Sequence, residues 1–136
     1  MSLLLAASKR AQSREEEIAN SLSHGLGLIA ALVAAPLLIR HAVRHGDVGF
    51  IVGASIFAAT MVQLYLASTL YHALPAGRAK RAFRVIEHSA IFLLIAGTYT
   101  PFTLGVLSGA SGWTLLGLVW GIAVAGVTLK ALNRLT

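Results

Sequence analysis

Two groups of polar side chains have the residue types and spacings that metal or acid–base chemistry requires. Glu17, Asn20 and His24 are spaced i, i+3 and i+7, which places them on one face of a helix. Ser68 and His72 are spaced i, i+4 and would also share a helix face. Neutral imidazole and carboxylate are good zinc ligands. A carboxylate beside zinc can hold or deprotonate a zinc-bound water.

Glu87 and the adjacent His88 form a third polar group. A simpler interpretation is open for all three groups, because polar side chains near the ends of membrane helices can lie at headgroup level and touch water. Glu87 could also form an ordinary i, i+3 pair with Arg84. The chemistry therefore depends on whether the elements that carry these residues bring them to one place.

The composition indicates an integral membrane protein. The chain has 136 residues, of which 57% are hydrophobic and 12% charged, and an ordinary soluble domain has about twice that charge. So few charges cannot cover a soluble surface, and disordered chains are poor in apolar residues. Both of those classes are therefore excluded. Cysteine is absent, which excludes disulfides and thiolate metal sites.

Charge-free intervals predict an all-α bundle of four transmembrane helices. The intervals 18–39, 48–77 and 88–129 contain 22, 30 and 42 residues. One crossing needs roughly 20 residues, so the third interval holds two helices, separated by turn-like residues 108–112. We expect a cytoplasmic N-terminal segment, 1–18, and a transmembrane domain, 19–136, with helices near 19–41, 47–73, 84–107 and 112–132.

The distribution of Lys and Arg predicts the orientation of this bundle. With the N-terminus inside, nine of these residues fall in cytoplasmic segments, and only Arg40 and Arg44 lie outside. The net charge of +6 therefore marks membrane ends, and we expect membrane lipids and no nucleic acid as partners. In this topology all three polar groups come to the cytoplasmic leaflet.

A second histidine pair lies at the other membrane end. His41 and His45 are spaced i, i+4, beside Arg40, Arg44 and Asp47. Such a pair can bind a metal, but side chains that extend to the membrane interface are the simpler interpretation.

Small residues indicate close helix contacts. The spacing Gly-x-x-x-Gly occurs at Gly49 and Gly53 and again at Gly117 and Gly121. It favours packing within the chain or association into a homo-oligomer.

The polar motifs resemble those of the bacterial hemolysin III family. The run Glu17-x-x-Asn20-x-x-x-His24 resembles the family's first motif, and the run 68–72, Ser-Thr-Leu-Tyr-His, resembles the end of its second helix. Residues 87–102 and 112–121 look like its third and fourth helices. The family belongs with the progestin and adipoQ receptors and, more distantly, with alkaline ceramidases.

The resemblance implies a seven-helix fold with a zinc site near the cytoplasmic side, of which this chain would form the first four helices. His72 matches the first zinc-binding histidine. Ser68 and Glu87 match a nearby serine and the aspartate presumed to hold the zinc-bound water, and are our candidate catalytic residues. Glu17, Asn20 and His24 match the family's first motif and are further candidate positions. A bacterial inner (plasma) membrane is the implied location.

The resemblance also implies that the zinc site is incomplete in this chain. The family's other two zinc ligands form a His-x-x-x-His pair on the last helix, and no such pair follows Lys130 in the given sequence. His88 is not a family ligand, and His24 would have to reach in from the first helix. We therefore expect a fragment, a truncated gene product or a short family member that alone binds zinc weakly or not at all.

Three functions are compatible with these features. The relatives imply a zinc-dependent hydrolase of lipid amides, of the ceramidase-like type, if the missing ligands are supplied, and the family name implies cytolytic activity. Other relatives imply a receptor or structural module without catalysis. A dimeric four-helix transporter is disfavoured because no Asp or Glu lies between residues 18 and 39.

Overall fold

The computed structural model describes residues 11–107 and 109–133. These residues form four α-helices and no strand. All four helices are long and apolar enough to cross a membrane. The predicted all-α membrane bundle is therefore confirmed. The helices are α2 (Arg14–His45), α3 (Val48–Ala73), α4 (Arg78–Gly105) and α5 (Gly109–Leu132).

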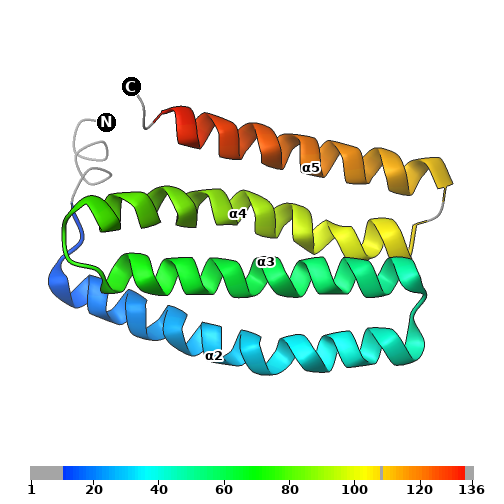
Figure 1. Cartoon of the computed structure of the whole chain (residues 1–136), viewed down its shortest axis with the longest axis horizontal. Coiled ribbons are helices and arrows are strands. Elements are labelled where there is room, and N and C mark those ends of the chain that lie inside the picture. The colour runs from blue at the N-terminus through cyan, green and yellow to red at the C-terminus, as the bar shows by residue number, and fades with distance from the viewer. Residues whose placement is uncertain (1–10, 108, 134–136) are drawn as a thin grey trace, which may run out of the picture.

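The four helices lie side by side in chain order, as Figure 1 shows. Each packs only against its neighbours in sequence within the described part of the chain, so α3 and α4 are the inner helices of the row. Successive helices run in opposite directions because the connections are short. The starts of α2 and α4 and the ends of α3 and α5 therefore share one end, which we call the Glu17 end. The opposite end is called the His41 end.

Helix α2 begins at Arg14, earlier than the expected start at residue 19. A capping box explains this start: Ser13 Oγ accepts a hydrogen bond from the Glu16 amide at 3.2 Å, and Glu16 Oε2 accepts one from the Ser13 amide at 2.7 Å. Glu17 thus belongs to the first turn of α2, and α4 likewise starts at Arg78, before the expected residue 84. Residues 1–10 of the expected N-terminal segment lie outside the described residues.

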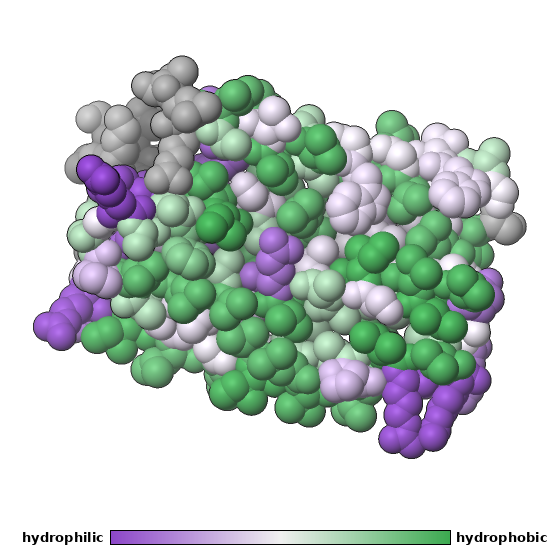
Figure 2. Space-filling model, in the orientation of Figure 1, coloured by the Kyte–Doolittle hydropathy of each residue, from purple (hydrophilic) through white to green (hydrophobic). Residues whose placement is uncertain are grey.

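The packing places small residues inside and large apolar residues outside. All of the buried hydrophobic residues in the described chain are alanines. Large side chains such as Leu22 and Leu26 are 70% and 69% exposed. Figure 2 shows hydrophobic residues over most of the middle of one face, with hydrophilic residues gathered mainly at the two ends. This arrangement suits helices that pack closely through small residues and present their long side chains to lipid.

Glycines bring the inner helices close together. A side chain at Gly49 or Gly53 would collide with the α4 backbone at Leu104 or Pro101. The first Gly-x-x-x-Gly spacing therefore serves packing within the chain. Gly117 and Gly121 on α5 have no heavy atom of another described residue near the position of a Cβ. Association of chains through that face stays a prediction.

Candidate metal centre

Helix α2 approaches α3 closely near the Glu17 end, and this approach orients the first motif. Gly27 leaves room for the ring of Tyr65, which a Cβ would overlap at 2.5 Å. The Ser21 hydroxyl donates a hydrogen bond to the Thr69 carbonyl at 3.3 Å. This packing turns the α2 face that carries His24 toward the end of α3.

A line of hydrogen bonds then crosses three helices. Ser68 Oγ donates to Glu87 Oε1 at 2.7 Å, and His24 Nδ1 lies 2.5 Å from Ser68 Oγ. Because the single hydroxyl proton is used on Glu87, His24 Nδ1 must donate its own proton to Ser68. A neutral His24 ring then keeps a lone pair on Nε2. The line thus joins α2, α3 and α4 through Ser68, which is 2% exposed.

His72 is held by a carboxylate from α2. Its Nδ1 lies 2.7 Å from Glu17 Oε2, and its Nε2 lies 3.7 Å from Glu87 Oε1. Donation of the Nδ1 proton to Glu17 leaves the Nε2 lone pair facing Glu87. A carboxylate that fixes the tautomer and orientation of a histidine in this way is the usual partner of a metal-binding imidazole.

Three of these residues can together hold a metal ion. One donor atom from each of His24, His72 and Glu87 lies within 4.8 Å of the others, and the two imidazole rings are 5.5 Å apart between centroids. Two imidazoles and one carboxylate match a zinc donor set. Ligands of a tetrahedral zinc ion lie about 3.4 Å apart. The donor chemistry therefore fits, and the two donor atoms that are farthest apart would have to move closer by at most about 1.4 Å.

The cluster is partly buried and opens onto a cavity. The side chains of His72, Glu87 and Glu17 are 7%, 13% and 19% exposed. They line a cavity of about 860 Å³ at the Glu17 end. A small molecule or a lipid headgroup can therefore reach His72 and Glu87 from this cavity.

Lys80 is a component of the cluster that sequence reasoning missed. Its Nζ lies 2.9 Å from Glu17 Oε1 and donates to the carbonyls of Tyr71 and Leu74 at 3.0 and 3.1 Å. It thereby ties the end of α3 and the start of α4 to the carboxylate that orients His72. One signal was available: a cation near the positive end of a helix is unfavourable unless a carboxylate compensates it.

Two residues of the polar groups are not members of the donor set, although His88 Nδ1 lies 3.6 Å from Glu87 Oε2. Asn20 is half-buried and donates to Gln12 Oε1 at 3.4 Å. His88 Nδ1 lies 2.6 Å from the Arg84 carbonyl, and its side chain is 37% exposed. The alternative pair between Arg84 and Glu87 does not form among the described residues, because Glu87 turns toward Ser68 and His72.

The other histidine pair has no comparable surroundings. His41 and His45 stack with ring centroids 4.5 Å apart, and His45 Nδ1 bonds to the His41 carbonyl at 3.1 Å. Both residues are exposed, and neither pairs with a carboxylate in the described part of the chain. The interpretation of this pair as interfacial stays a prediction.

The fold and the cluster define a multi-pass α-helical membrane protein with histidine and carboxylate donors gathered at one membrane end. Comparison of the sequence with known protein families identifies its family. The model of the haemolysin-III-related family matches residues 12–136, and the chain belongs to this family.

Two relatives show how much of the family's length is present. Hemolysin-3 of Bacillus cereus is 45% identical over 116 residues, which cover 85% of this chain and 53% of that protein. The hemolysin-3 homolog of Bacillus subtilis (strain 168) is 46% identical over 116 residues, covering 85% and 54%. The chain therefore spans about half the length of these relatives. No solved structure gives a significant match.

Proposed function

We propose that this chain carries a zinc site whose protein ligands are His24, His72 and Glu87, and that the site serves hydrolysis of a lipid amide. The observation that carries the proposal is the convergence of these three donors from three helices. The resemblance assigned only His72 as a ligand and led us to expect little or no zinc binding. Because His24 and Glu87 add two donors to His72, we now propose that the chain binds zinc measurably.

Each residue of the cluster has a role in this proposal. Glu17 accepts the Nδ1 proton of His72 and keeps the opposite ring nitrogen unprotonated. Ser68 holds Glu87 Oε1 in place with its hydroxyl proton. Glu87 can accept a proton from water at a carboxylate oxygen and return it to the departing amine. Zinc, when bound, supplies a Lewis acid that polarises a carbonyl and activates water.

Metal analysis of the purified chain tests the zinc site. We expect about one zinc per chain in the wild type and loss of that zinc in the His72→Ala variant. The His41→Ala/His45→Ala double variant is the matched control, because it removes two exposed histidines at the other end. Equal zinc content in all three proteins would contradict the proposal.

Hydrolysis needs a separate assay. Zinc-loaded chain in mixed micelles should release fatty acid from a short-chain ceramide faster than the same chain after a chelator has removed the zinc. Equal release by the zinc-loaded and the zinc-free chain would instead support a receptor or structural module without catalysis.

Cytolytic activity is a second candidate, favoured by the name hemolysin-3 that both relatives carry. Proteoliposomes that contain the chain and a trapped dye would test it. Dye release above that of vesicles with an unrelated four-helix membrane protein would support cytolysis, and equal release would contradict it.

We also propose that the Glu17 end faces the cytoplasm of a bacterial inner membrane. The support is the asymmetric distribution of Lys and Arg. Because the chain has no native cysteine, a single cysteine at Val43 should react with an impermeant reagent in intact cells. One at Ala79 should react only after permeabilisation, and the opposite pattern would contradict this orientation.

A further inference from the structure

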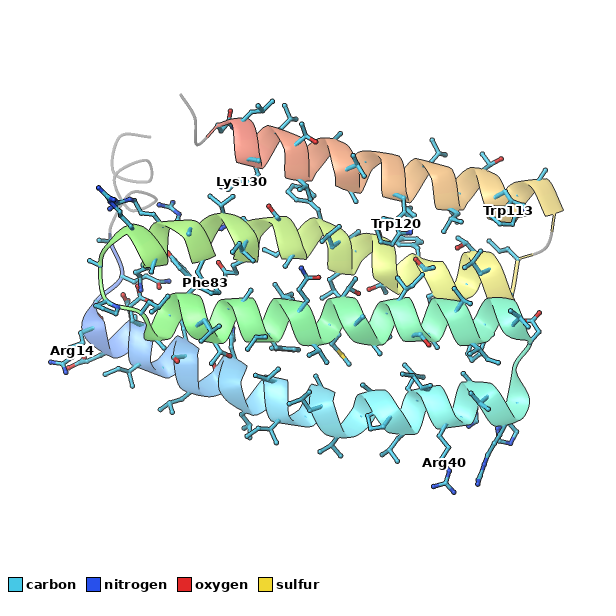
Figure 3. The ribbon with its side chains drawn as sticks, in the orientation of Figure 1. Arg14, Arg40, Phe83, Trp113, Trp120 and Lys130 are labelled. Atoms are coloured by element: carbon cyan, nitrogen blue, oxygen red, sulfur yellow. The ribbon has the colours of Figure 1, made fainter. Side chains whose placement is uncertain are left out.

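Basic residues at the Glu17 end line a second cavity, between α4 and α5. This cavity has a volume of about 210 Å³ and is lined by Arg81, Arg84 and Val85 from α4 and by Lys130 and Asn133 from the end of α5 and beyond. Figure 3 shows Lys130 at the end of α5 that lies beside the start of α4. Three cationic side chains from two helices thus face one space.

These cations have no carboxylate partner among the described residues. Glu87 is spaced i, i+3 from Arg84 and could pair with it, but Ser68 holds Glu87 in the candidate metal centre. Glu17 is likewise occupied by His72 and Lys80. No carboxylate is among the described residues that line this cavity, so its positive charge is left uncompensated there.

The start of α4 adds to this positive charge. Its first turn contains no acidic residue, and Gly77 provides no side-chain cap, whereas α2 begins with three glutamates. The amino-terminal end of a helix carries a partial positive charge, which repels cations and attracts anions. An anion in the cavity would relieve the repulsion among Arg81, Arg84 and the helix end.

We propose that this cavity binds the phosphate group of an anionic membrane lipid. Two guanidinium groups match the oxygens of a phosphate through paired hydrogen bonds, and Lys130 adds a third charge. A lipid is the source because the cavity lies at one end of two helices that can span the membrane, where headgroups are found. Ile86 and Leu129, which follow Val85 and precede Lys130 in the sequence, are 43% and 62% exposed and leave apolar surface near these helix ends for acyl chains.

Native mass spectrometry of the 136-residue chain from mixed micelles tests this site. The wild type should retain phosphatidylglycerol and release phosphatidylcholine. The Arg81→Gln/Arg84→Gln variant should bind phosphatidylglycerol about thirtyfold more weakly, because each cation near a membrane surface contributes substantially. The Lys130→Gln variant should lose about fivefold and decides the question if the double variant does not fold.

The matched control is the Arg40→Gln/Arg44→Gln variant, which removes two exposed arginines at the opposite end and should retain phosphatidylglycerol. Equal losses in the two double variants would overturn the proposal, as would equal retention of both lipids by the wild type. Displacement of phosphatidylglycerol by an equal concentration of inorganic phosphate would assign the site to free phosphate. That result would also overturn the proposal of a lipid site. None of these outcomes depends on zinc, so they leave the metal centre to its own test.

Discussion

The two ends of the bundle each carry a pair of histidines, and only one pair has the surroundings of a metal site. His24 and His72 come from different helices, lie close to buried Ser68 and each contact a side chain that holds the ring. His41 and His45 are one turn apart on α2, exposed and stacked on each other. Both ends of the bundle therefore contain two histidines close to each other.

The difference lies in the carboxylates and the helices that supply them. At the Glu17 end, Glu17 orients His72, and Glu87 completes a set of three donors. At the His41 end, Asp47 accepts a hydrogen bond from the Phe50 amide as the cap of α3 and is not paired with either histidine. Histidine spacing alone is thus a weak predictor, and convergence with carboxylates from other helices is a strong one.

The largest effect is expected for the donors that the structure adds to His72. His24→Ala and Glu87→Gln should each weaken zinc binding by more than ~100-fold, since even the loss of an outer partner costs ~10–100-fold. Competition titration with a fluorescent chelator measures the affinity. Asn20→Ala is the matched control, because Asn20 lies one turn before His24 on α2 but donates to Gln12 Oε1, and the zinc affinity of this variant should not change.

A smaller effect is expected for the carboxylate that orients His72. Glu17→Gln should weaken zinc binding by about 10–100-fold without removing a ligand, because the amide no longer accepts the Nδ1 proton as strongly. The same titration applies. The exposed Glu15 lies in the same first turn, and the Glu15→Gln variant should bind zinc as the wild type does. Equal weakening of zinc binding in both variants would mean that Glu17 acts only through its negative charge and does not orient His72.

The smallest effect is expected for a polar contact that holds no metal donor. Trp120 Nε1 on α5 donates to Thr100 Oγ1 on α4 at 3.1 Å, and both tryptophans are labelled in Figure 3. Trp120→Phe should lower the free energy of unfolding in detergent by about 0.6 kcal/mol. Trp113→Phe, at a residue that is 68% exposed, should change it less. Circular dichroism during titration with SDS measures the free energy of unfolding of both variants. A change in the zinc affinity of either variant would contradict the expectation that this contact is independent of the metal donors.

Charge-free intervals were sufficient to predict four helices, because a membrane span needs a long apolar run whatever its neighbours are. The meeting of Ser68, His72 and Glu87 was also predictable. Antiparallel helices with a short connection place the end of one beside the start of the next, and the structure brings these three side chains together.

The choice of His24 over Asn20 could not be predicted from the sequence. Helix α2 has apolar residues around its whole circumference, so its pattern does not fix the rotation about its axis. Contacts made by Gly27 and Ser21 set that rotation, which aims His24 at Ser68 and leaves Asn20 beside Gln12. The contact of Lys80 with Glu17 depends on the same tertiary packing, because the two residues are far apart in the chain.

The central claim is that one metal ion is held by donors from three helices at the Glu17 end. X-ray absorption at the zinc edge of the zinc-loaded chain tests it most directly, with the His24→Ala/His72→Ala and His41→Ala/His45→Ala variants as the two comparisons. We predict two imidazole nitrogens and a carboxylate oxygen at about 2.0–2.2 Å in the wild type and in the His41→Ala/His45→Ala variant. The imidazole signal should disappear in the His24→Ala/His72→Ala variant. An imidazole signal that survives there and disappears when His41 and His45 are removed would contradict the account.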